Sequence, residues 1–250
     1  MTGGAGGLGA TIAEGFLGAG FSVVITGRHA ETLAATARSL DPSGERVVSL
    51  VCDNRNENDV ATLVDMTLSR FGRIDVLVNN SGIAGPTCPL WEYSITDWQD
   101  TIDTNLTGTF LCCRAVLPTM IGQGSGSIVT IGSVTGKRPN PGRAGYAASK
   151  TALIGLTRTL AAEAGPHGVR INLVSPGAID SDRFRAVIDA MAESQSISAE
   201  VVLGQAVSES PLGRLVAAAD VSAAVVFLGS DRAASITGED LNVSAGLVMY

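Results

Sequence analysis

The segment FSVVITG, residues 21–27, introduces the pattern that the rest of the chain repeats. Its run of apolar and β-branched residues is typical of a strand buried on both faces. The segment AETLAATARSL (30–40) follows with helical spacing of its apolar residues, and RVVSLVCD (46–53) is a second apolar run. A strand, a helix and a strand in this order predict a parallel pair joined by a helical crossover.

Further strand-like runs and helical patterns alternate along the remaining chain. Strands are predicted at 74–80, 126–133, 169–177 and 239–245, and helices at 57–72, 96–121, 144–165 and 219–229. This alternation predicts an α/β fold with a doubly wound parallel sheet and helices on both faces. Because no repeat or linker divides the 250 residues, we expect one domain, 1–250, in which helical spacing at about 180–210 predicts a lid.

The composition excludes several classes of function. With 45% hydrophobic and 16% charged residues, the chain is expected to be globular, and its net charge of −7 argues against nucleic acid or an anionic membrane as a partner. No apolar run is long enough to span a bilayer, and nothing resembles a secretory leader, so a cytoplasmic protein is expected. The two histidines and four cysteines lack metal-ligand spacing, so no metal and only reduced thiols are expected.

The glycine-rich opening MTGGAGGLGA (1–10) is the first candidate site. Glycines allow close backbone approach, and the free N–H groups of a helix starting at about Leu8 suit a pyrophosphate. A merely flexible start is the alternative. The residues assigned to the pyrophosphate loop are Thr2, Gly3, Gly7, Leu8 and Gly9.

Other candidate cofactor residues stand where predicted strands end. Arg28 follows Gly27, where an NAD-binding fold usually has an acidic residue, so Arg28 favours the 2′-phosphate of NADP(H), although a solvated arginine is the alternative. Asp53, next to Asn54, is expected either to accept a hydrogen bond from adenine or to cap the next helix. The third strand ends in NNSG, which suits either a close approach to ribose or a plain turn, with Asn79, Ser81 and Gly82 as candidates.

The segment YAASK carries the strongest local signal for catalysis. Tyr146 and Lys150 lie at i and i+4 of a predicted helix and project from one face. A neighbouring ammonium group lowers the pKa of a phenol, which makes it a usable acid and base near neutral pH. Ser133, at another strand end, is placed to hold a substrate carbonyl.

Together these motifs resemble the short-chain dehydrogenase/reductase family over nearly the whole chain. The ordered set is Thr2-Gly3-x3-Gly7-x-Gly9, Asp53, Asn79-Asn80-Ser81-Gly82, Asn105 in DTNLTGTF, Ser133, Tyr146-x3-Lys150 and Asn172-x2-Ser175-Pro176-Gly177. The resemblance implies a Rossmann-like α/β/α fold and an oxidoreductase that acts on a CH–OH group with NAD(P).

The resemblance also implies a role for each catalytic position. Tyr146 would be the general acid for carbonyl reduction and the general base for alcohol oxidation. Lys150 would lower its pKa and bind the nicotinamide ribose, and Ser133 would polarise the carbonyl. Asn105 would bind a water that links Lys150 to solvent. The nicotinamide carboxamide would meet Ile179 and Ser181, which follow Pro176 and Gly177.

Two departures from the family pattern stand at the ends of the chain. The family's V-D-G-G stretch is replaced by NVSAG (242–246), and the apolar central strand that precedes the glycine-rich loop is represented only by Met1. A central parallel strand pairs on both sides, so we expect two unpaired sheet edges. Either the sequence is shortened, or stability and cofactor affinity are expected to be low.

Three functions are compatible with the sequence. The first is an NADP(H)-dependent oxidoreductase, with NAD(H) also possible, that interconverts a small ketone and a secondary alcohol. The second is a 3-oxoacyl-acyl-carrier-protein reductase, for which Lys137, Arg138 and Arg143 would form a basic docking patch. The third is a non-catalytic nucleotide-binding subunit. Family resemblance further implies a homotetramer, or a homodimer, with helices 96–121 and 146–164 at one interface.

Overall fold

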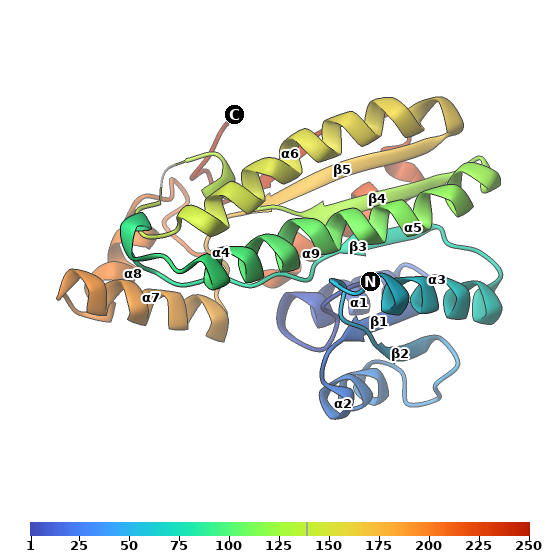
Figure 1. Ribbon diagram of the computed structural model, residues 1–250, viewed down its shortest axis with the longest axis horizontal. Coiled ribbons are helices and arrows are strands. Elements are labelled where there is room, and N and C mark those ends of the chain that lie inside the picture. Colours follow the sequence, from blue (N-terminus) through green and yellow to red (C-terminus); the bar gives the residue numbers. More distant parts are fainter. Residues whose placement is uncertain (139) are drawn as a thin grey trace.

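A computed structural model describes residues 1–138 and 140–250 of the chain (Figure 1). Its strands are β1 (Val23–Gly27), β2 (Val47–Val51), β3 (Val76–Asn79), β4 (Gly126–Ile131), β5 (Val169–Pro176) and β6 (Asp240–Val243). The helices are α1 (Gly7–Gly18), α2 (Ala30–Leu40), α3 (Glu57–Phe71), α4 (Ile95–Ile102), α5 (Gly108–Gln123), α6 (Ala144–Ala164), α7 (Asp182–Gln195), α8 (Ala199–Ser208) and α9 (Ala218–Gly229). The α/β fold and each predicted strand are confirmed.

All strand pairs are parallel, and helices cover both faces. Alternate strand residues point to opposite sides, so Val24 and Ile128 join a core with α3, α5 and α6. Ile25 and Val129 join the other core, with α1, α2 and α9. Figure 1 shows α5 and α6 in front of β4 and β5, with α9 behind them. The described residues include no helix with the length and apolarity needed to cross a membrane.

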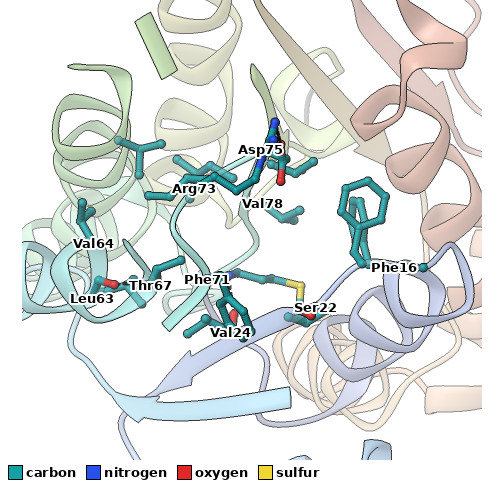
Figure 2. A pocket seen from close by; sticks show the side chains of 18 residues that line it. Phe16, Ser22, Val24, Leu63, Val64, Thr67, Phe71, Arg73, Asp75 and Val78 are labelled. Carbon is teal, nitrogen blue, oxygen red and sulfur yellow. Dashed lines mark hydrogen bonds and ion pairs between the residues drawn. The ribbon is translucent and has the colours of Figure 1, made fainter. Parts of the chain in front are cut away.

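The strands form two sheets rather than one continuous sheet. One has the order β1-β2 and the other β3-β4-β5-β6. Between β1 and β3 lies a cavity of about 340 Å³, surrounded mainly by apolar side chains such as Phe16, Val24, Phe71 and Val78 (Figure 2). The two edges expected from the sequence therefore face each other across this cavity.

Met1 and Thr2 join the two sheets at one end of the cavity. The Met1 amino group donates to the Val24 carbonyl at 2.6 Å, and the Thr26 N–H donates to the Met1 carbonyl at 3.0 Å. The Thr2 N–H donates to the Val78 carbonyl at 3.0 Å. These bonds follow the pattern of a parallel ladder, with the opening residues between β1 and β3.

One predicted helix differs from the structure. The helix expected at 96–121 is divided into α4 and α5 by a π-helical turn at Asp103–Thr107. A π turn inserts an extra residue per turn without ending the helical path, so the apolar periodicity of the sequence hides it. The predicted lid is the helix pair α7 and α8, which has its own small core of Ile188, Ala192 and Val202.

Candidate active site

The glycine-rich opening loop is tied to the end of β3. The Thr2 hydroxyl oxygen accepts hydrogen bonds from the N–H groups of Asn80 at 3.1 Å and Ser81 at 3.0 Å. The Asn80 side-chain amide donates to the Gly3 carbonyl at 2.9 Å. The structure thus brings together the two predicted segments 1–10 and 79–82, and Asn80 is an anchor that the sequence did not single out.

The start of α1 has the geometry of an anion site. Gly3 has φ +63°, and a Cβ on Gly9 would lie 2.0 Å from the Gly3 carbonyl oxygen, so only glycine fits at position 9. The N-cap residue Gly6 provides no side-chain cap to α1, and the first turn holds no acidic residue. The N–H groups at this helix start are therefore suited to a pyrophosphate.

Several charged side chains lie beyond the carboxyl ends of β1 and β2. Arg28 is exposed directly after β1. Arg55 binds both carboxylate oxygens of Asp53, at 2.6 Å and 3.0 Å, and also pairs with Asp100 at 2.5 Å. These hydrogen bonds from Arg55 lower the pKa of Asp53 below its ordinary value. Asn56, not Asp53, caps α3, which removes the helix-cap alternative for Asp53.

Two of the predicted cofactor residues use their side chains inside the protein. The Asn54 amide donates to the Thr104 carbonyl, within the π turn, at 3.1 Å. The Asn79 amide donates to the hydroxyl of Thr130 and the thiol of Cys113, both at 3.3 Å. Both asparagines are buried. Their side chains therefore form hydrogen bonds within the protein beside the ends of β2 and β3.

Tyr146 lies in the first turn of α6 and has two cations near its ring. The Lys150 ammonium nitrogen is 5.7 Å from the centre of the Tyr146 ring, and the Arg143 guanidinium carbon is 4.8 Å from it. Lys150 donates to the Ile131 carbonyl of β4 at 2.7 Å, whereas Arg143 donates to the Ala84 carbonyl at 3.0 Å. Both cations are buried, so little solvent separates their charges from the tyrosine ring.

Asn105 connects three parts of the site from the π turn. Its side-chain oxygen accepts from the Ile83 N–H at 2.8 Å, and its amide donates to the Ile83 carbonyl at 3.1 Å and the Ser149 hydroxyl at 3.0 Å. The Ser149 hydroxyl in turn donates to the Tyr146 carbonyl at 2.8 Å. A Cβ on Gly82 would lie 3.1 Å from the Asn105 oxygen. The loop after β3, the π turn and α6 are thereby held as one unit.

Ser133 lies just beyond the end of β4, two residues after the carbonyl that Lys150 binds. Its hydroxyl oxygen accepts from the Thr135 N–H at 3.1 Å and caps the short 3-10 helix Val134–Gly136. The residue is half-buried. The predicted hydroxyl is therefore at the same edge of the sheet as Lys150.

The segment after β5 leads into α7, the first helix of the predicted lid. Gly177 passes so close to Ser244 that a Cβ on it would lie 3.0 Å from the Ser244 Cα. Ile179 pairs with Val216 in an isolated parallel bridge. Ser181 caps α7 by accepting from the Phe184 N–H at 3.2 Å. Ile179 and Ser181, which are predicted to meet the nicotinamide, are thus held in place directly before α7.

The basic docking patch expected from Lys137, Arg138 and Arg143 does not form. Arg143 is 4% exposed beneath the loop at Ala84, and the Lys137 side chain is 8% exposed in an ion pair. Only Arg138 reaches the surface, where it pairs with Glu209 at 3.3 Å. Sequence proximity suggested a cluster, but the fold turns two of the three cations inward.

Known proteins resemble this chain over its whole length. A family model described as enoyl-(acyl carrier protein) reductase matches residues 3–248. The 3-oxoacyl-(acyl-carrier-protein) reductase of Synechocystis sp. is 38% identical over 252 residues, which cover 100% of this chain and 96% of that protein. The corresponding reductase of Escherichia coli is 36% identical over 249 residues, with the same coverage.

Solved structures share the fold at high similarity. NAD⁺-bound xylitol dehydrogenase has a TM-score of 0.95 and 30% identity, and covers 98% of this chain and 96% of its own. An actinorhodin polyketide ketoreductase variant with NADPH has a TM-score of 0.94 and 33% identity, and covers 100% and 96%. With the strand-end loops and the Tyr146–Lys150 helix in place, these matches show that the chain belongs to the short-chain dehydrogenase/reductase family, a family of oxidoreductases that act on CH–OH and carbonyl groups.

Proposed function

We propose that this chain is an NADP(H)-dependent oxidoreductase that interconverts a ketone and a secondary alcohol. The observation that carries the proposal is the position of Tyr146 beside the buried ammonium group of Lys150, with Asn105 and Ser149 holding the helix turn. Such a constellation suits a proton transfer to or from a substrate oxygen. We also propose that residues 1–250 act as one domain.

In this proposal Tyr146 gives its hydroxyl proton to the carbonyl oxygen during reduction and takes it back during oxidation. Lys150 favours the phenolate form through its positive charge. Ser133 donates a hydrogen bond to the same oxygen and stabilises its developing negative charge. Asn105 positions a water that returns protons to Lys150. The nicotinamide, when bound, supplies or accepts the hydride.

The cofactor fits the residues at the strand ends. Gly3 and Gly9 leave room for a pyrophosphate at the uncapped start of α1. Arg28 is exposed beyond β1, where it can pair with a 2′-phosphate, and Arg55 neutralises the nearby Asp53. Xylitol dehydrogenase is bound to NAD⁺ and the polyketide ketoreductase to NADPH, so the preference for NADP(H) rests on Arg28.

The Arg28→Asp variant tests this preference directly. Removing the cation and adding an anion is expected to weaken NADPH binding about tenfold or more, with NADH binding unchanged or tighter. Titration of both cofactors by fluorescence measures the two affinities. An unchanged ratio would remove Arg28 from the cofactor site.

A second candidate is a 3-oxoacyl-acyl-carrier-protein reductase. The relatives at 36% and 38% identity carry this name, and they match the chain over its full length. Against it, two cations of the expected docking patch are buried. Rates with a 3-oxoacyl thioester and with a panel of free small ketones distinguish the two substrate classes.

The catalytic assignment is tested with Tyr146→Phe and Lys150→Met. Loss of the proton donor is expected to lower kcat by roughly 10²–10⁴. Tyr250→Phe, at a tyrosine that is 80% exposed, is the matched control and is expected to keep the wild-type rate. If the wild-type protein binds NADPH but oxidises it with no carbonyl compound, the chain is a non-catalytic nucleotide-binding subunit instead.

We further propose that the protein is cytoplasmic and assembles as a homotetramer or homodimer through α4, α5 and α6. Exposed apolar side chains on α4 and α5 support such an interface: Ile95, Phe110 and Ile121. Light scattering after gel filtration measures the assembly.

A further inference from the structure

A buried ion pair lies next to the candidate active site and has no role in the proposed chemistry. The Lys137 ammonium is 2.8 Å from a carboxylate oxygen of Asp240, and the two side chains are 8% and 6% exposed. Lys137 also donates to the side-chain oxygen of Asn242 at 2.5 Å. A buried pair of charges is costly unless further hydrogen bonds support it, and it stabilises little by itself. The pair is therefore more informative for the two segments that it joins than for the stability that it contributes.

The other carboxylate oxygen of Asp240 connects the pair to β5. It accepts a hydrogen bond from the Ser175 hydroxyl at 2.6 Å. Ser175 lies directly against Gly132, because a Cβ on Gly132 would be 2.7 Å from the Ser175 oxygen. The Gly132 N–H donates to the neighbouring Val174 carbonyl at 2.7 Å. Asp240 thus holds the Ser175 hydroxyl, which packs against Gly132, the residue immediately before Ser133.

Lys137 supports the same turn from its other end. The turn runs from Gly132 through Ser133 and the 3-10 helix, and the Lys137 N–H closes it by donating to the Val134 carbonyl at 2.9 Å. One carboxylate, from β6, therefore holds both ends of the turn that presents the Ser133 hydroxyl. Asp240 lies 107 positions after Ser133 in the sequence.

We propose that Asp240 and Lys137 are positioning residues that fix the direction of the Ser133 hydroxyl toward the substrate carbonyl. The inference rests on the proposed function, in which Ser133 stabilises the carbonyl oxygen. An oxyanion donor displaced by about 1 Å loses much of its effect, so a loosened turn lowers kcat while leaving cofactor binding intact.

The first test is Asp240→Asn, which keeps the shape and an oxygen for Ser175 but removes the charge that binds Lys137. With one ketone that the wild type reduces, kcat is expected to fall roughly tenfold, while the KM for NADPH changes less than about twofold. Arg170→Met is the control, because Arg170 is a partly buried cation of β5 that binds Leu228 and Ser230 far from the turn. It is expected to lower Tm and to leave kcat unchanged.

The decisive measurement repeats Asp240→Asn in a Ser133→Ala background. If Asp240 acts through Ser133, the second substitution is expected to lower kcat by less than about twofold there. An equal loss of kcat in both backgrounds overturns the inference, because the ion pair then acts independently of Ser133. If Ser133→Ala alone keeps the wild-type kcat, the catalytic role of Ser133 fails, which is a separate result.

A milder variant covers the case in which Asp240→Asn does not fold. Ser175→Ala removes only the hydroxyl that joins Asp240 to Gly132, and it is expected to lower kcat about threefold in the wild type and not in Ser133→Ala. A wild-type kcat in a folded Ser175→Ala protein contradicts the proposal.

Discussion

Gly9 packs so closely on the glycine-rich loop that a side chain there would displace the loop. Gly9→Ala is expected to place a methyl group against the Gly3 carbonyl, at 2.0 Å before relaxation. Overpacking of this kind costs about 1–3 kcal/mol, and the displaced loop is expected to bind NADPH more weakly. Thermal unfolding and a fluorescence titration measure the two effects.

Gly6→Ala is the matched control for this substitution. A Cβ at Gly6 meets nothing within 4 Å, and its φ of 168° is ordinary extended backbone. Equal effects of the two variants would show that the loop needs flexibility in general rather than close contact at Gly9.

The cysteines predict a pH-dependent reactivity. Burial raises the pKa of the Cys52 thiol to about 11 and those of Cys112 and Cys113 to about 12, so at pH 8 these groups remain protonated thiols. Cys88 is half-buried in the loop beside Gly142. Iodoacetamide at pH 8 is therefore expected to modify Cys88 first, as peptide mass spectrometry can measure. Prior modification of any buried cysteine in folded protein contradicts this.

Residue positions were predictable from the sequence only where the signal is local. Tyr146 and Lys150 are four positions apart on a helix, so their shared face follows from helix geometry. The Lys137–Asp240 pair joins residues 103 positions apart, and no periodicity connects them. Arg143 was interpreted as a surface charge, although it packs on the Tyr146 ring, because a basic residue in a loop carries no sequence sign of burial.

Among the elements, the helix pair α7 and α8, which is the predicted lid, has a core separate from the two main cores. Val202→Ala is expected to loosen α7 against α8 and to raise the KM for the ketone several-fold, because a loosened lid excludes water less well. The Tm is expected to change little, since the cluster of Ile188, Ala192 and Val202 is separate from the two main cores. Steady-state kinetics and calorimetry measure both quantities.

The neighbouring residue provides the control for the lid. Val202 is 3% exposed and Val201 is 49% exposed on the same helix. Val201→Ala is therefore expected to leave KM unchanged. A KM that rises equally in both variants would indicate contact with the substrate rather than packing within the lid.

Most elements were predictable because parallel strands are apolar on both faces and helices have a clear period. The π turn was not predictable, since Asp103–Thr107 continues the helical path and its single extra residue leaves the apolar pattern on both sides intact. Its position became clear only from the contacts of Asn105, whose side chain binds Ile83 and Ser149.

At the scale of the whole molecule, filling the apolar cavity between β1 and β3 is expected to raise the free energy of unfolding. Met1 pairs with β1 as a parallel strand does, so β-branched residues placed ahead of it are expected to continue that pairing along the cavity. Five added β-branched residues are expected to raise Tm by roughly 5 °C or more by burying apolar surface. A Gly-Ser extension of equal length is the control, and an equal rise would contradict the explanation.

The divided sheet also gives an expectation for amide hydrogen exchange. The residues assigned to the 2′-phosphate and adenine, Arg28 and Asp53, follow β1 and β2. Ser133 follows β4, and Tyr146 and Lys150 lie on α6, which packs on the β3–β6 sheet. A dinucleotide bound in the proposed site would contact both sheets and so hold them together. Amide hydrogen exchange in β1 is therefore expected to slow on NADPH addition more than exchange in β4, which is paired on both sides.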